Sequence, residues 1–412
     1  MSQRQGRADH RRTRAIRVLA AALAALTSLG ATAYASAADA GHAAALSPHA
    51  TPEPLPRLAP PCLERCEAAS AAGRPAGRLR YVARTGRDSG RGTKSRPWRT
   101  IEHALKAVGP GTRILVRGGT YSERIFAGPN GAAGAEISLQ PHPRERVILR
   151  VQMILRNATH VRVRGFVFDG RGRSGTAIRI DGGAFVTFSR NEVRNYRRTT
   201  SSQAFLLDED TFKPSIVANR VHDTGIWTQH DHGVYCKNAR GAYIANNLFY
   251  DLDKGAGIQL YANEGTGCDG SLITANTIVG NETSGIVISR GADGNLITGN
   301  IIAGHVSTET GSRGHAVIEG AGIGVGNVVR NNLGFQNGRE DDFLCPSCAE
   351  LSGNIVGDPS FLNPAAGDFR LRAGSAAADR GVGADAPPQD HDGTPRPQGP
   401  APDLGAFELR VR

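Results

Sequence analysis

Short segments in which hydrophobic and polar positions alternate recur along the chain from about residue 160 onward. Each segment closes on Gly or Asn, and successive closing residues lie 23 to 31 positions apart: Gly165, Asn191, Asn219, Asn246, Asn276, Asn300, Asn331 and Asn354. Two-residue alternation with many β-branched side chains indicates strands, and a repeat of about 20 to 50 residues is typical of solenoids. We therefore expect an all-β fold, a single-stranded right-handed parallel β-helix in which each repeat adds one turn.

The recurring asparagines have a structural explanation. Asn tolerates the left-handed backbone of a sharp turn, and amide side chains stacked from turn to turn can hydrogen-bond with one another. We expect these residues to hold successive turns together, and we assign them no catalytic role.

A second set of apolar segments lies between the Asn turns and predicts the inner wall of the coil. Its first inward column comprises Ile178, Phe205, Val234, Ile258, Ile286 and Val317. The next inward column, two residues further along, comprises Ile180, Leu207, Cys236, Leu260 and Ile288. The residues between and after these columns should point outward, because successive side chains of a strand face opposite ways.

Both ends of the coil are expected to carry caps within one domain of residues 78–412. In the N-terminal cap, residues 78–117, Thr100 is a candidate N-cap of a short amphipathic helix that Pro110 and Gly111 end. The apolar face of this helix comprises Ile101, Ala104, Leu105 and Val108. The C-terminal cap, residues 355–412, is expected to be rich in loops.

The first 37 residues are typical of an export signal. Six arginines precede an apolar run from Val18 to Leu29, and small residues follow at positions 33–37. The apolar run is shorter than the ~20 residues that a membrane-spanning helix needs. We therefore expect a signal peptide at residues 1–37, an Ala- and Pro-rich linker at residues 38–77, and a secreted protein without a membrane anchor after cleavage, exported by either the general or the twin-arginine route.

Charge and cysteines refine this picture. The net charge of +11 becomes 11 − 5 = +6 once the signal, with its six Arg and one Asp, is removed. A mildly basic exported monomer suits an anionic polysaccharide, whereas dispersed basic residues do not favour nucleic acid. Six cysteines in an exported chain suggest disulfides, most simply Cys62–Cys66, Cys236–Cys268 and Cys345–Cys348, with zinc as the alternative for the two close pairs.

Two sequence blocks resemble a known family. The N-terminal block YVARTGRDSGRGTKSRPWRTIEHALKAVGPGTRILVRGGTY is similar to the entry module of secreted pectate-lyase-like β-helix proteins, including polysaccharide lyase family 9. The C-terminal blocks GDPSFLNPAAGDFRLRAGSAAADRGV and DHDGTPRPQGPAPDLGAFE are similar to the closing segment of the same group. With the repeats, this resemblance spans roughly residues 80–408 and implies a polysaccharide-active coil.

Polar residues of the outward columns form the candidate site. Arg179, Tyr235 and Gln259 share one column and are candidate substrate-binding residues. Asp181, Asp208, Lys237 and Tyr261 share the next column, with Arg290 beside it, His232 just before its strand and Glu209 just after. Polar clustering on one outer sheet of a solenoid is typical of a binding groove.

These residue types suit β-elimination of a uronate-containing polysaccharide. The reaction needs a base for the proton α to the carboxylate, for which Lys237 is the first candidate, and positive charge for the developing anion, for which Arg290 is the candidate. Tyr261 or His232 could protonate the leaving oxygen, and calcium held by Asp208, Glu209 and Asp181 could neutralise the substrate carboxylate. Without calcium, an adjacent Asp208 would keep Lys237 charged, and His232 becomes the better base.

Three alternatives stay open at this level. Asp208 and Lys237 could form a surface salt bridge worth under ~1 kcal/mol with no role in chemistry. The carboxylates of Asp181, Asp208 and Glu209 could serve a glycoside hydrolase. The same coil could also be a non-catalytic carbohydrate-binding or cell-surface protein, because function depends on the site and not on the fold.

Overall fold

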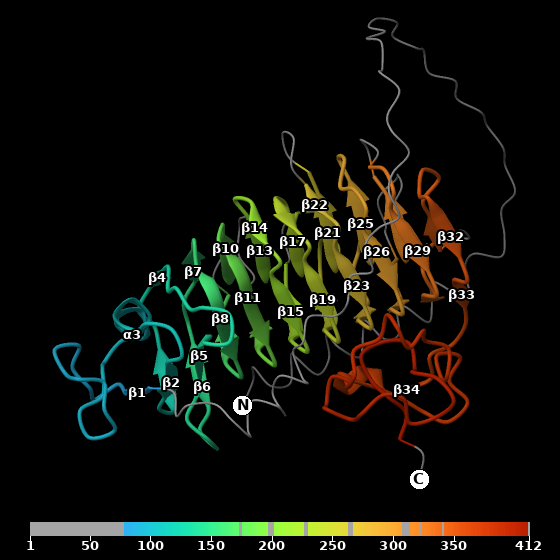
Figure 1. The fold of residues 1–412 in the computed structure, drawn as a ribbon. Helices are drawn as coiled ribbons and strands as arrows, with labels where there is room; N and C mark the ends of the chain where they lie inside the picture. The colour runs from blue at the N-terminus through green and yellow to red at the C-terminus, as the bar shows by residue number, and fades with distance from the viewer. Residues whose placement is uncertain are drawn as a thin grey trace, which may run out of the picture. The chain divides into compact units, whose positions relative to one another are not determined.

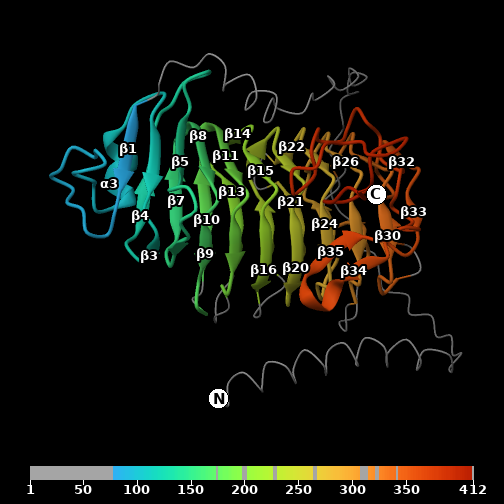
Figure 2. The same ribbon diagram turned by 90° about the horizontal axis from the view of Figure 1, so that it is seen from below.

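A computed structural model describes residues 78–172, 175–196, 202–225, 230–262, 267–306, 314–320, 324–339 and 342–410. These residues form the predicted right-handed parallel β-helix, so the fold expected from the repeats is confirmed. Figures 1 and 2 show its short strands stacked side by side along the coil. The predicted signal peptide, the predicted linker and the pair Cys62–Cys66 lie outside the described residues. Within the described residues, no helix is long and apolar enough to cross a membrane.

Three parallel sheets make the walls of the coil. The longest, sheet A, has 14 strands. Its main path is β1 (Leu79–Val82), β2 (Arg113–Val116), β5 (Ile137–Pro141), β8 (Thr159–Arg164), β11 (Ala184–Ser189), β15 (Ser215–Val217), β19 (Tyr243–Ala245), β23 (Leu272–Thr274), β26 (Leu296–Thr298), β29 (Val328–Arg330) and β32 (Glu350–Ser352). Three short strands lie off this path: β14 (Thr211–Phe212), β18 (Ala239–Arg240) and β22 (Cys268–Asp269).

The two other sheets complete each turn. Sheet B has 10 strands: β3 (Gly119–Tyr121), β6 (Val147–Leu149), β9 (Val167–Asp169), β12 (Glu192–Arg194), β16 (Arg220–Thr224), β20 (Leu248–Leu252), β24 (Thr277–Val279), β27 (Ile301–Ala303), β30 (Leu333–Phe335) and β33 (Ile355–Val356). Sheet C has 9 strands: β4 (Ile125–Ala127), β7 (Met153–Arg156), β10 (Ile178–Asp181), β13 (Phe205–Asp208), β17 (Val234–Cys236), β21 (Ile258–Tyr261), β25 (Ile286–Ser289), β28 (Val317–Glu319) and β31 (Phe343–Leu344).

Sheet C confirms the two predicted inward columns. The strand register aligns Ile178 with Phe205, and the alignment continues through Val234 to Val317. Every member of both columns is fully buried. The alternation of hydrophobic and polar positions was therefore sufficient to tell the inner face of this sheet from its outer face.

A ladder of asparagines, buried at every turn but the last, occupies the two-residue corner between sheets A and B. Its members are Asn191, Asn219, Asn247, Asn276, Asn300, Asn332 and Asn354. At each step from Asn191 onward, one Asn donates its backbone N–H and its side-chain amide to the Oδ1 of the Asn on the next turn, over 2.9 to 3.1 Å.

For two turns, the predicted ladder position, Asn246 or Asn331, is wrong by one residue. Asn247 and Asn332 carry the ladder, whereas Asn246 and Asn331 precede them with left-handed φ values of 55° and 51°. The left-handed turn and the amide stacking, which we had assigned to one residue, belong to adjacent positions. Where two asparagines follow each other, the sequence pattern does not show which one has which role.

The predicted N-terminal helix is present as α3 (Ile101–Ala107). The Thr100 side chain accepts a hydrogen bond from the backbone N–H of His103, which confirms the predicted N-cap. Ile101, Ala104 and Leu105 are buried in the core, and Val108 packs against it as the C-cap. The helix contacts β1 and β4 at the N-terminal end of the coil (Figure 1).

Two of the three predicted disulfides lie in the described residues, and both are confirmed. Cys236 and Cys268 are bonded, as are Cys345 and Cys348. Cys236 is at once a fully buried member of an inward column and half of a disulfide. Packing and cross-linking, which are competing explanations at the level of sequence, therefore act together there.

The loop-rich C-terminal segment, residues 369–410, packs against the outer side of sheet B. Phe369 and Phe407 cluster with Leu248, and Leu371 and Leu404 cluster with Ile301. The segment begins within strand β35 (Asp368–Leu371), which follows the 3-10 turn η1 (Pro364–Ala366) and pairs with β34 (Phe361–Asn363) in a separate two-stranded sheet.

We predict that Asn276→Ala lowers the free energy of unfolding by about 2 to 4 kcal/mol, because it leaves buried polar groups of Asn247 and Ile244 unpaired. Chemical denaturation followed by circular dichroism measures this change. Asn354→Ala is the matched control at the end of the ladder, where fewer hydrogen bonds are lost and the effect should be smaller. Equal effects at the two positions would contradict a ladder that couples successive turns.

Candidate functional site

The outer face of sheet C brings together the predicted site residues. Arg179, Leu206, Tyr235, Gln259 and Val287 align across β10, β13, β17, β21 and β25. Asp181 aligns with Asp208, and Tyr261 with Ser289, in the neighbouring column. These positions share one wall because parallel pairing places equivalent residues of successive repeats side by side.

Arg179 lies at the centre of an ionic cluster. Its guanidinium pairs with the Oδ1 of Asp181, reaches the Oδ2 of Asp208 at 3.3 Å and the carboxylate of Glu209 at 3.8 Å. Arg156 adds a second contact to Asp181 at 3.4 Å. The Asp181 and Asp208 carboxylates are only 2% and 5% exposed, so this cluster lies in the sheet surface and not above it.

Lys237 joins this cluster from the end of β17. Its Nζ lies 3.6 Å from the Oδ2 of Asp208, while Asn238 donates to the other oxygen of Asp208 at 3.3 Å. The lysine side chain is 30% exposed and its aspartate partner is buried. The pair is therefore not the freely exposed salt bridge that we considered from the sequence, because Asp208 divides its interactions between Lys237, Arg179 and Asn238.

Three further side chains form an aromatic and cationic group beside Lys237. The rings of Tyr235 and Tyr261 meet edge to face with centroids 5.7 Å apart, and the Arg290 guanidinium lies 5.7 Å from the Tyr261 ring. Burial, helped by the nearby Tyr261 and the negative charge of Asp208, raises the pKa of Tyr235 to about 12. Tyr235 therefore stays protonated to a higher pH than an ordinary tyrosine.

Gln259 and His232 are fixed by their neighbours. Gln259 donates to the hydroxyl of Ser289 at 3.1 Å. His232 is buried under Tyr235, with ring centroids 5.2 Å apart, and its Nδ1 accepts the backbone N–H of Ala256. Burial lowers the pKa of His232 to about 3, which disfavours the role of general base that the sequence allowed for it.

The predicted calcium ligands do not fit a calcium site. Calcium binds six to eight oxygen atoms, whereas Asp181, Asp208 and Glu209 all contact the Arg179 guanidinium and Asp181 also contacts Arg156, so two fixed positive charges already lie against these carboxylates. Over the described ranges, no group of three or more His, Cys, Asp or Glu side chains is placed to hold a metal ion. The sequence places these carboxylates correctly on one wall but does not show which cation neutralises them.

An exposed aromatic column, which we did not predict, begins four residues beyond these carboxylates. His160, Phe185 and Phe212 lie side by side on β8, β11 and β14. The His160 ring stacks on Phe185 with centroids 4.7 Å apart, and Phe185 meets Phe212 edge to face at 5.7 Å. Phe185 and Phe212 are 41% and 38% exposed, and the Lys213 ammonium lies 5.2 Å from the Phe212 ring. The signal in the sequence was an aromatic residue four positions after each Asp of the outward column.

Backbone strain accompanies this aromatic column. Phe185 has φ 56°, His160 φ 49° and Lys213 φ 48°. A left-handed backbone is a true outlier for a bulky residue and costs of order 1–3 kcal/mol. Neither the exposure of these rings nor the strained backbone stabilises the fold, so these residues suggest a role in binding.

Comparison with known proteins gives two family matches. The profile of the family described as "Periplasmic copper-binding protein (NosD)" matches residues 143–316, and the profile described as "Protein of unknown function (DUF1565)" matches residues 84–126. The first match covers most of the described coils, and the second covers α3 and the strands around it.

One curated protein and two solved structures give further matches. Uncharacterized protein YwoF of Bacillus subtilis is 35% identical over 69 residues, which is 17% of this chain and only 15% of that protein. The crystal structure of pectate lyase Pel9A has a TM-score of 0.50 at 17% identity over 83% of this chain and 98% of that one. A structure named glycoside hydrolase has a TM-score of 0.52 at 10% identity over 68% of this chain and 96% of that one. These matches agree with the coil described above, and the chain has the parallel β-helix fold that the pectate lyase Pel9A structure also has.

Proposed function

We propose that this protein is exported, binds an acidic polysaccharide along the outer face of sheet C, and cleaves it by β-elimination. The observation that carries the proposal is the group of charged and aromatic side chains on four successive strands of one sheet, β10, β13, β17 and β21, with Lys237 and Arg290 just beyond the ends of β17 and β25. Two solved structures of similar fold, titled pectate lyase Pel9A and glycoside hydrolase, support this choice of ligand, since pectate is an acidic polysaccharide.

The binding part of the proposal uses both this group and the aromatic column. Arg290, whose guanidinium lies 5.7 Å from the Tyr261 ring, supplies positive charge for the carboxylates of a uronate polymer. Phe185 and Phe212 present exposed ring faces on which the apolar face of a sugar ring can stack, in line with the use of exposed apolar patches as binding grooves.

In the chemical step, the Nζ of Lys237 in its neutral form takes the proton from the carbon next to the substrate carboxylate. The electron pair of that C–H bond forms the new carbon–carbon double bond, and the bond to the leaving glycosidic oxygen breaks. Tyr261 donates a proton to this oxygen, and Arg290, which lies against the Tyr261 ring, stabilises the negative charge that develops on the carboxylate.

We place the base at Lys237 and not at His232. The Lys237 side chain is 30% exposed on the outer face of sheet C, whereas His232 is buried and burial lowers its pKa to about 3. Arg179 and Asn238 share the Asp208 carboxylate with Lys237, each at 3.3 Å.

Export is proposed on the predicted signal peptide together with the disulfides. Disulfide bonds persist in oxidising compartments and are rare in the bacterial cytosol. The two bonds among the described residues, Cys236–Cys268 and Cys345–Cys348, are consistent with folding outside the cytosol.

We predict that Lys237→Ala lowers the rate of polysaccharide cleavage at least about 100-fold while leaving the melting temperature within a few degrees, because removal of a general base costs about 100- to 10,000-fold. The assay is the rise in ultraviolet absorbance from unsaturated products during incubation with pectate, alginate or glycosaminoglycans. Lys254→Ala, which removes a lysine paired with Glu282, is the matched control and should keep full activity. Full activity of the Lys237 variant would remove the base from the scheme.

The same incubation separates the proposal from its rivals. New reducing ends without ultraviolet absorbance would indicate a glycoside hydrolase that uses the carboxylates of the cluster. Binding without any cleavage would indicate a non-catalytic carbohydrate-binding protein. Either result overturns β-elimination.

A chelator provides a second prediction. Because the guanidinium groups of Arg179 and Arg156 already lie against the three carboxylates that could hold calcium, we expect cleavage to be unchanged by an excess of chelator and by added calcium. The measurement is the initial rate in chelator-treated buffer with and without calcium. Loss of activity that calcium restores would contradict the role given to Arg179.

Phe185→Asn tests the aromatic column. Asn tolerates a left-handed backbone better than Phe, so we expect thermal stability to be kept or raised. We expect polysaccharide binding to weaken about tenfold, which corresponds to about 1.4 kcal/mol. Calorimetric titration and a thermal melt give the two readouts, and Leu351→Ala, at an exposed position of sheet A, is the control. Unchanged binding would exclude this ring as a sugar platform.

A further inference from the structure

A cavity of about 500 Å³ opens on the outer side of sheet B, away from sheet C. Its floor is formed by β12, β16 and β20, and residues 391 and 392 of the C-terminal segment form one wall. Polar side chains from Glu192, Arg220, His222 and Tyr250 line it. A concave site of this size, with convergent polar groups, is typical of a pocket for a small ligand.

Two guanidinium groups in this cavity have no carboxylate partner among the described residues. Arg190 donates to the backbone carbonyl of His391 at 3.1 Å, and Arg220 interacts with the hydroxyl of Tyr250. Other arginines nearby are paired, such as Arg194 with Asp169 at 3.1 Å. Unpaired guanidinium groups that line a cavity favour a bound oxyanion, because Arg matches carboxylate geometry.

The acidic residue on the floor does not cancel this positive charge. The Glu192 carboxylate forms ion pairs with Arg194 at 2.7 Å, His222 at 3.2 Å and Arg146 at 3.7 Å. Burial lowers the pKa of His222, but hydrogen bonds to Asp223 and Glu192 outweigh it and raise the pKa above its ordinary value. The carboxylate of Glu192 is thus neutralised by its own neighbours.

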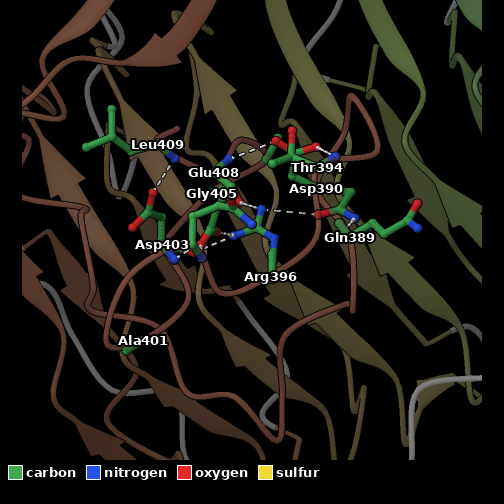
Figure 3. Close-up of polar contacts among 12 residues, drawn as sticks. Gln389, Asp390, Thr394, Arg396, Ala401, Asp403, Gly405, Glu408 and Leu409 are labelled. Carbon is green, nitrogen blue, oxygen red and sulfur yellow. Dashed lines mark hydrogen bonds and ion pairs between the residues drawn. The ribbon is translucent and has the colours of Figure 1, made fainter. Parts of the chain in front are cut away.

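The wall of the cavity is firmly attached to the coil. The Nδ1 of His391 hydrogen-bonds the backbone carbonyl of Asn246 at 2.9 Å, and the side chain of Asn246 donates to the carbonyl of Gln389 at 2.6 Å. Behind it, the buried Arg396 pairs with Glu408 at 2.9 Å and donates to two backbone carbonyls, as Figure 3 shows. The pocket is therefore a fixed feature of the folded protein.

We propose that this pocket binds a single uronate sugar unit, with its carboxylate between Arg190 and Arg220. The polar lining suits the hydroxyl groups of a sugar better than an apolar ligand. Asp392 borders the pocket and has no cationic partner among the described residues, so its negative charge weakens the binding of an anion. This site lies on a different sheet from the proposed cleavage surface and does not depend on it.

The test is calorimetric titration of the full chain with galacturonate, with galactose as the uncharged counterpart and sodium sulfate as a simple oxyanion. We expect galacturonate to bind, galactose to bind with at least tenfold lower affinity, and sulfate to bind with lower affinity than galacturonate. Arg220→Gln should weaken galacturonate binding about tenfold, and Asp392→Asn should strengthen it severalfold, with thermal melts to verify that each variant is folded.

One control tests whether binding depends on this pocket. Arg240→Gln removes an exposed arginine paired with Asp210 at another wall and should leave binding unchanged. The pocket shares no residue with the outer face of sheet C, so failure of the cleavage proposal would not affect this result. Equal binding of galactose, tighter binding of sulfate than of galacturonate, or full affinity in folded Arg220→Gln would overturn the proposal.

Discussion

The structure depends on one repeated interaction, the buried hydrogen bonds between asparagine side chains at the corner between sheets A and B. Each Oδ1 accepts a hydrogen bond from the backbone N–H and another from the side-chain amide of the Asn on the preceding turn. The backbone N–H of the ladder residue, which lies between two sheets and belongs to neither, is therefore paired. All the steps point the same way along the coil, which aligns their dipoles and lets neighbouring hydrogen bonds reinforce one another. The height of each turn, and hence the position of every outward residue, follows from this corner.

Much of the fold could be predicted because a solenoid translates sequence period directly into spatial neighbours. The inward columns through Ile178 and Ile180 needed only the two-residue alternation, and α3 needed only a cap and an apolar face. The ladder positions at Asn246 and Asn331 were wrong because two adjacent asparagines fit the same pattern. The left-handed residue comes first and the stacking residue second, a distinction that depends on backbone geometry.

The candidate site could be predicted as a location but not as a set of interactions. Register places Asp208 and Lys237 on one wall, and the structure brings them within 3.6 Å. The sequence could not show that Arg179 would turn along the sheet to pair with the carboxylates, or that His232 would be buried beneath Tyr235, since both depend on side-chain orientation. The pocket on sheet B was beyond prediction for another reason, because Arg190 and His391 are 201 residues apart in the chain.

The C-terminal segment covers apolar side chains of sheet B that the coils leave uncovered when they first form. Each coil can form on its predecessor as the chain grows, but the outer side chains of Leu248, Ile301 and Leu333 are covered only by residues near the end. A chain that stops early would keep its coils and leave an uncovered apolar strip along one flank. Exposed apolar strips promote association between molecules. By covering this strip, residues 369–410 remove a surface through which molecules would associate.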